Sequence, residues 1–173
     1  LLSVGSTSQV TWKRFQRKAL TLANLSHPKI IHIHDYGEYD GIPYLVMEYI
    51  PGGTLLDKLI LPLPHDQAAS LLAPIASALG YAHRHGVIHR DVKPRNILMR
   101  TPEDPVLTDF GIAKKMDGVT LELTGTGLTV GTPGYMAPEQ WKGKEVDEWS
   151  DIYSLGVVYY ELVTGRKPYE ADT

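Results

Sequence analysis

The segment VIHRDVKPRNILM, at positions 87–99, places a run of charged and polar side chains between two apolar clusters. The flanking positions 87–88 and 97–99 carry β-branched or large aliphatic residues, so we expect two short buried strands that anchor the loop between them. The polar residues are His89, Arg90, Asp91, Lys93, Arg95 and Asn96. Because loops between strands are often polar only through contact with water, this segment needs support from elsewhere in the chain.

A second candidate is the segment LTDFGIA, at positions 107–113, where a carboxylate follows an apolar run and precedes a glycine. Carboxylate and amide oxygens are hard ligands that suit Mg²⁺, and a lysine can balance phosphate charge. A remaining carboxylate can accept the proton of a hydroxyl group. The four residues that supply these groups are Asp91, Lys93, Asn96 and Asp109. Their types indicate a site for Mg²⁺ and polyphosphate.

The composition is that of one ordinary globular domain. The 173 residues are 43% hydrophobic and 21% charged, with a net charge of -3 and no cysteine. The slightly acidic balance gives no basic surface for nucleic acid or anionic lipid. The longest apolar stretch, at 153–163, is far shorter than the roughly 20 residues that span a bilayer. We therefore expect a cytoplasmic domain with no nucleic-acid partner and no membrane segment in this chain, while an anchor outside it is left open.

The hydrophobic pattern changes along the chain from mixed to mainly helical. It predicts a helix at 12–25 with Phe15, Ala19, Leu22 and Leu25 on one face. Two strands, at 30–33 and 44–50, are predicted with a turn at positions 40–41. A longer helix is expected at 67–86, capped by residue 66, kinked by the proline at 74 and ended by the glycine at 86. Residues 150–165 are apolar nearly all round, which is typical of a buried helix. The predicted class is α+β.

In order along the chain, the motifs read H-R-D-x-K-x-x-N, then D-F-G, then MAPE at 136–139. This order resembles that of protein kinases. The sequences of the segments GTPGYMAPEQ and SDIYSLGVVYYELVTGRKPYEADT are similar to those of bacterial Ser/Thr kinases. The resemblance covers essentially the whole chain. It implies a protein-kinase-like fold, with a partial small β-rich lobe at 1–47, a hinge at 48–53 and a partial, mainly helical large lobe at 54–173.

The resemblance assigns roles to the polar residues by their position in the motifs. It implies that Asp91 is the catalytic base and that Lys93 stabilises charge on the transferring phosphoryl group. Asn96 and Asp109 are the implied ligands of Mg²⁺. ATP and Mg²⁺ are therefore the expected cofactors, and proteins with Ser or Thr hydroxyls the expected substrates.

The same resemblance places an adenine pocket at the hinge. Backbone groups of Glu48 and Ile50 are implied to meet the adenine edge, with Met47 as the gate to the space behind and Leu98 as the floor. Met47 and Leu98, each taken alone, are also compatible with plain core packing.

A hydrophobic stack that is assembled in the active state is implied for Leu22, Ile33, His89 and Phe110. Asp151 is implied to fix the catalytic loop from the start of the buried helix.

Regulation by phosphorylation is implied by Arg90, because a buried guanidinium before the catalytic aspartate needs an anion. Between Asp109 and Glu139 we expect autophosphorylation by a second copy of the kinase, at Thr124 or Thr126. The threonines at positions 120 and 129 are the alternatives.

Two further residues of this segment take roles from the resemblance. Thr132 matches the threonine associated with Ser or Thr acceptors. Glu139 is expected to pair with an arginine that lies beyond position 173.

The chain departs from the family pattern near its start. Positions 4–10 hold one glycine where a glycine-rich loop has three, and the phosphate-binding lysine is expected before position 1. Lys18 stands where the pattern has the glutamate that pairs with this lysine, and residues 1–34 contain no acidic residue. Lys18 is then a defect in an ion pair, a phosphate ligand in its own right, or a surface lysine.

We therefore expect an incomplete Ser/Thr kinase domain, truncated at both ends and inactive by itself. A pseudokinase or non-catalytic interaction module is the alternative. A small-molecule phosphotransferase is disfavoured by the GTPGYMAPE segment. The histidines at 32–34 and 83–85 have ligand-like spacing, but no further cluster supports a metal site.

Overall fold

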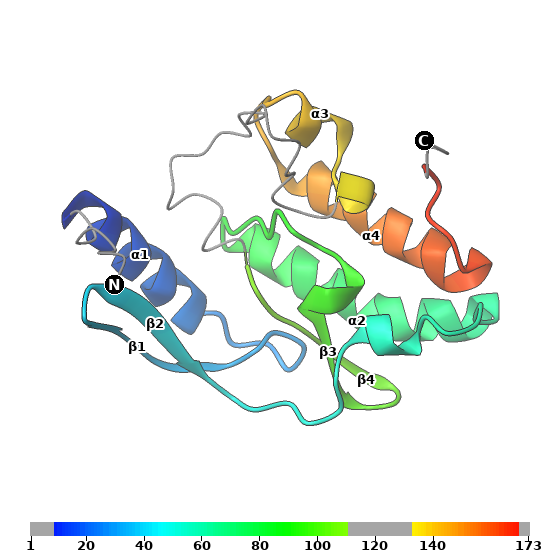
Figure 1. The fold of residues 1–173 in the computed structure, drawn as a ribbon, viewed down its shortest axis with the longest axis horizontal. Coiled ribbons are helices and arrows are strands. Elements are labelled where there is room, and N and C mark those ends of the chain that lie inside the picture. Colours follow the sequence, from blue (N-terminus) through cyan, green and yellow to red (C-terminus); the bar gives the residue numbers. More distant parts are fainter. Residues whose placement is uncertain (1–8, 111–132, 170–173) are drawn as a thin grey trace, which may run out of the picture.

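The computed structural model describes residues 9–110 and 133–169, without the side chains of positions 9–11, 14, 18 and 133. Its first part is a helix, α1 (Gln9–Ala23), packed on a hairpin of β1 (Ile33–Tyr39) and β2 (Ile42–Met47) (Figure 1). The predicted apolar face is confirmed for Phe15, Ala19 and Leu22, which are buried in α1, whereas Leu25 is buried just beyond the end of the helix. The predicted turn is also confirmed: positions 40 and 41 both have positive φ, at 49° and 77°.

The second part is mainly helical, with a second two-stranded antiparallel sheet (Figure 1). Its helices and strands are α2 (His65–Arg84), β3 (Ile97–Thr101), β4 (Asp104–Leu107), α3 (Pro138–Trp141) and α4 (Glu148–Thr164). Short 3₁₀ turns lie at Leu55–Lys58, Pro94–Asn96 and Pro133–Tyr135. Helices α2 and α4 pack together over one continuous core, which includes Ile75, Leu79, Val158 and Leu162. The predicted α+β class is confirmed.

Two predicted strands are wrong in position, for identifiable reasons. The first strand begins at Ile33 rather than at residue 30, because Ile30 and Ile31 pair instead with Leu107 of β4. Positions 87–88 form no strand, since the main-chain N–H of Val87 is used to close the end of α2. That N–H donates to the carbonyl of Ala82 over 3.0 Å, and the preceding glycine has φ 71°. This is a Schellman-type helix end.

The helix boundaries differ slightly from those predicted. Helix α2 begins at His65, after Pro64 as the N-cap, so Asp66 lies in its first turn instead of capping it. Helix α4 is capped by Asp147, whose side chain accepts from the N–H of Trp149. Among the described residues, none of the helices has the length and apolar character required to cross a bilayer.

The close approach of Gly52 to β3 gives a stability prediction. A Cβ at Gly52 would lie 2.1 Å from the carbonyl oxygen of Met99. This oxygen belongs to the main chain of β3, so it cannot move away without distorting the strand. We expect Gly52→Ala to lower the free energy of unfolding by about 1–3 kcal/mol. Gly80→Ala, in helix α2, is the matched control, because the nearest atom is the end of a flexible arginine at 3.6 Å.

For Gly80→Ala we expect no loss, or a gain of about 0.5–1 kcal/mol, since alanine costs less backbone entropy in a helix. Urea unfolding of both variants measures the difference. Equal stability of the two variants would contradict the packing described for Gly52.

Candidate active site

One buried carboxylate holds the loop that carries the predicted catalytic residues. Asp151, in the first turn of α4, is only 1% exposed. Its Oδ1 accepts the main-chain N–H of Arg90 over 2.8 Å, and its Oδ2 accepts the main-chain N–H of His89 over 2.8 Å. The same Oδ2 also accepts from Nε2 of His83 over 2.8 Å. The negative charge is therefore met by three donors, which is what a carboxylate needs when it is buried.

His89 continues this network as a neutral ring with a defined tautomer. Its Nδ1 faces the main-chain N–H of Asp91 at 3.2 Å and must accept, so its Nε2 carries the hydrogen donated to the carbonyl of Thr108 at 2.8 Å. Complete burial lowers the pKa of His89, although the nearby carboxylates of Asp151 and Asp91 oppose the shift. The ring also contacts Phe110, with centroids 4.5 Å apart.

Asp91 points its carboxylate at two donors from its own loop. Its Oδ2 accepts from Nζ of Lys93 at 2.8 Å and from Nδ2 of Asn96 at 3.0 Å. The second hydrogen of the Asn96 amide goes to the main-chain carbonyl of Asp91 at 2.8 Å. All three side chains are buried or half-buried. The loop thus presents a carboxylate and an ammonium side by side.

The two predicted Mg²⁺ ligands offer suitable oxygen atoms. Because both amide hydrogens of Asn96 are used, its Oδ1 remains as the acceptor atom. Asp109 is exposed, with φ 58°, and within the described residues its carboxylate has no hydrogen bond or ion pair. The main-chain N–H of Thr108 donates to the carbonyl of Asn96 over 3.0 Å, which ties the two segments together. Such a donor set, completed by phosphate and water, fits Mg²⁺.

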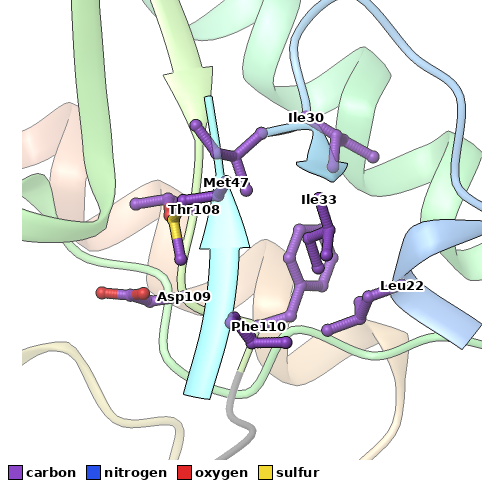
Figure 2. A pocket seen from close by; sticks show the side chains of 9 residues that line it. Leu22, Ile30, Ile33, Met47, Thr108, Asp109 and Phe110 are labelled. Carbon is purple, nitrogen blue, oxygen red and sulfur yellow. The ribbon is translucent and has the colours of Figure 1, made fainter. Parts of the chain in front are cut away.

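An apolar pocket lies between the small sheet and the end of β4 (Figure 2). It is lined by the predicted gate residue Met47 and by Leu22, Ile33 and Phe110 of the predicted stack. The carboxylate of Asp109 points away from Leu22 and Phe110 in Figure 2. Through the contact of Phe110 with His89, the stack reaches from α1 to the catalytic loop.

The remaining hinge residues lie beside this pocket. Ile50 is buried in a separate small cluster with Ile31 and Val106, and Leu98 packs against that cluster. Glu48 turns its side chain toward Arg100, whose Nη2 is 3.0 Å from its carboxylate, and it also accepts the main-chain N–H of His32. Although partial burial opposes the shift, these two donors lower the pKa of Glu48.

The predicted regulatory residues are only partly covered by the structure. Arg90 is half-buried and adopts φ 70°. Glu139 accepts a hydrogen bond from the hydroxyl of Ser150, which lowers the pKa of its carboxyl. The threonines at positions 124, 126 and 132 lie outside the described residues, as does the side chain of Lys18.

Two residues that contact the site were missed by reasoning from the sequence. His83, which the sequence indicated only as one of two histidines with metal-ligand-like spacing, donates from Nε2 to the carboxylate of Asp151. Gln140, the last residue of the segment GTPGYMAPEQ and one to which no role was assigned, donates from Nε2 to the main-chain carbonyl of Arg90. Neither has a signal in periodicity or spacing, because both act across large separations in the chain.

Comparison with known proteins gives consistent results. Residues 2–173 match the protein kinase domain family. The chain is 42% identical to the probable serine/threonine-protein kinase PknB of Lactococcus lactis, over 92% of this chain and 26% of that protein. It is 40% identical to the serine/threonine-protein kinase PrkC of Bacillus subtilis, over 93% and 25% respectively. The chain thus spans about a quarter of the length of these curated relatives.

A solved structure is similar to this fold. The crystal structure of the Mycobacterium tuberculosis PknI kinase domain superposes with a TM-score of 0.74 at 32% sequence identity. The match covers 95% of this chain and 61% of that one.

The neutral, buried His89 gives a pH-dependent prediction. The folded state binds fewer protons than the unfolded state at pH values between the lowered pKa and the ordinary value of 6.5. Stability must therefore fall as the pH drops below about 6.5, by up to about 1.4 kcal/mol per pH unit. Urea unfolding at a series of pH values measures this slope.

His89→Phe should remove much of the slope, whatever it does to stability at pH 7.5. The pKa of His27 is also lowered by partial burial and by Arg84 and Lys29, so His27→Gln is the comparison that measures the share of His27 in the slope. A slope unchanged by His89→Phe would show that His89 is not the group responsible.

Proposed function

Because this chain belongs to the protein kinase domain family, we propose that the protein that carries it is a Ser/Thr protein kinase. It would transfer the γ-phosphoryl group of ATP to Ser or Thr hydroxyls of protein substrates. The observation that supports this best is the carboxylate of Asp91, placed 2.8 Å from Lys93 and 3.0 Å from Asn96. The similar proteins of Lactococcus lactis and Bacillus subtilis carry names that agree with this activity.

The chemistry assigns one step to each side chain of the loop. The substrate hydroxyl would donate its proton to Asp91 as its oxygen bonds to the γ-phosphorus, and the bond to the β,γ-bridging oxygen breaks to release ADP. Lys93, already paired with Asp91, is in reach to balance charge on the transferring group. Asn96 and Asp109 would hold Mg²⁺, which neutralises phosphate charge when bound.

The adenine ring is proposed to lie against the strand end at Met47 and the segment that follows. Backbone groups of Glu48 and Ile50 would bond its edge, and Leu98 would form the floor. The ion pair of Glu48 with Arg100 supports this, because it turns the Glu48 side chain to a partner on β3.

A non-catalytic kinase-like module is the second candidate. The observation that favours it is the lysine at position 18, in helix α1, together with the lack of any acidic residue over positions 1–34. Such a module would keep the fold of the loop at 89–96 but would transfer no phosphate.

Substitution of Asp91 separates these two candidates. In the full-length protein we expect Asp91→Asn to lower kcat by about 10²–10⁴-fold, because the proton acceptor is removed. The KM for ATP should change little, since Asp91 acts on the hydroxyl group. Asp66→Asn, an exposed carboxylate in α2, is the matched control. Transfer of labelled phosphate to a protein substrate is the measurement, and ATP binding without transfer by the wild type would favour the second candidate.

Autophosphorylation is proposed at Thr124 or Thr126, in the segment between Asp109 and Glu139. The added phosphate would pair with Arg90, a half-buried residue. We expect phosphopeptide mapping of active protein to find phosphate on one of these threonines, and Arg90→Gln to remove the activation that it produces. Phosphate found only on other residues of this segment would refute the assignment.

A further inference from the structure

Gln140, in the short helix α3, uses both ends of its side-chain amide. Its Oε1 accepts the main-chain N–H of Ala137 over 3.0 Å, and its Nε2 donates to the main-chain carbonyl of Arg90 over 3.0 Å. The two contacts fix the orientation of the amide, because a flipped amide would oppose N–H to N–H and oxygen to oxygen. Gln140 therefore joins α3 to the catalytic loop, 50 residues away in sequence.

The carbonyl that Gln140 binds belongs to the peptide that leads directly into Asp91. The N–H of this peptide donates to Nδ1 of His89 at 3.2 Å, so the peptide is held on both sides. The N–H of Arg90 is held in turn by Asp151. Arg90 has φ 70°, a conformation that costs energy for a side chain of this kind and persists only when its surroundings enforce it.

Helix α3 also contacts α4 at Ser150, one residue before Asp151, whose carboxylate holds the catalytic loop. Glu139, the neighbour of Gln140, accepts from the hydroxyl of Ser150, which precedes Asp151. The segment 137–141 thus contacts the catalytic loop directly through Gln140 and approaches its anchor through Glu139.

We propose that Gln140 is a positioning residue for Asp91. By donating to the carbonyl of Arg90, it orients the peptide that sets the direction of the catalytic carboxylate, and it couples the placement of α3 to that direction. This inference rests on the proposed kinase function, and it gives a role at that site to a residue of the GTPGYMAPEQ segment that had none.

The substitution Gln140→Glu tests the donor alone. It keeps the size of the side chain and the acceptor for the N–H of Ala137, but it places a carboxylate oxygen against the carbonyl of Arg90. In the full-length protein we expect kcat to fall by about tenfold or more, the effect of one lost and reversed hydrogen bond. The KM for ATP should stay within about twofold, because this contact does not involve the nucleotide.

The pH dependence of this variant distinguishes positioning from loss of structure. A carboxylate held against the carbonyl oxygen of Arg90 should have a raised pKa, and its protonation restores an O–H donor. The ratio of variant to wild-type kcat should therefore rise as the pH falls from about 8 to about 6. Gln140→Met, which has a similar size but no donor at any pH, should lose activity without this recovery. Gln67→Glu, the same change at an exposed position of α2, should behave as the wild type.

A readout independent of catalysis is hydrogen exchange of the segment 88–93, followed by mass spectrometry in the full-length protein. We expect faster exchange there in Gln140→Glu and Gln140→Met, with the core of α2 and the thermal midpoint unchanged. If the wild type transfers no phosphate, the proposed function fails while exchange still decides the role of Gln140. Wild-type exchange in both variants, or faster exchange spread over the whole domain, would overturn the inference.

Discussion

The buried carboxylate of Asp151 is the interaction on which the site depends. A charge in the core is tolerated only when donors surround it, and here two of the three donors are main-chain N–H groups of the catalytic loop. Removing the loop would leave His83 as the one described donor to this buried charge, and removing the charge would release the loop. The stability of the core and the geometry of the site therefore depend on the same set of hydrogen bonds.

This dependence explains two of the three described non-glycine residues with positive φ. Arg90 and Asp109 have φ of 70° and 58°, and both stand within two residues of a side chain to which we assign chemistry. Each follows an anchored position: Arg90 comes after His89, and Asp109 comes after Thr108, whose carbonyl accepts from that histidine. One neutral imidazole thus connects the two bends, which keeps Asp91 and Asp109 in a fixed relation even though they come from different segments.

The sequence predicted those parts of the protein that depend on local pattern or on an ordered set of motifs. Correct predictions were the apolar face of α1, the turn at positions 40–41 and the α+β class. The kinase-like fold was also predicted correctly, as the superposition on a solved kinase domain shows. Contacts across the fold made by residues with no assigned role were not predicted. His83 and Gln140 bind main-chain or carboxylate atoms 68 and 50 residues away, and the strand expected at residue 30 fails because Ile30 pairs with the other sheet.

That misplaced segment is what joins the two sheets. The carbonyl of Lys29 and the N–H of Ile31 both bond Leu107 of β4, while the carbonyl of His32 accepts the N–H of Glu48 at the end of β2. The side chains repeat the connection, since Lys29 pairs with Asp104, which also meets Arg100, the partner of Glu48. The segment 29–32 is thus hydrogen-bonded to both walls of the apolar pocket. Its backbone therefore helps to set the spacing of these walls, whichever side chains line the pocket.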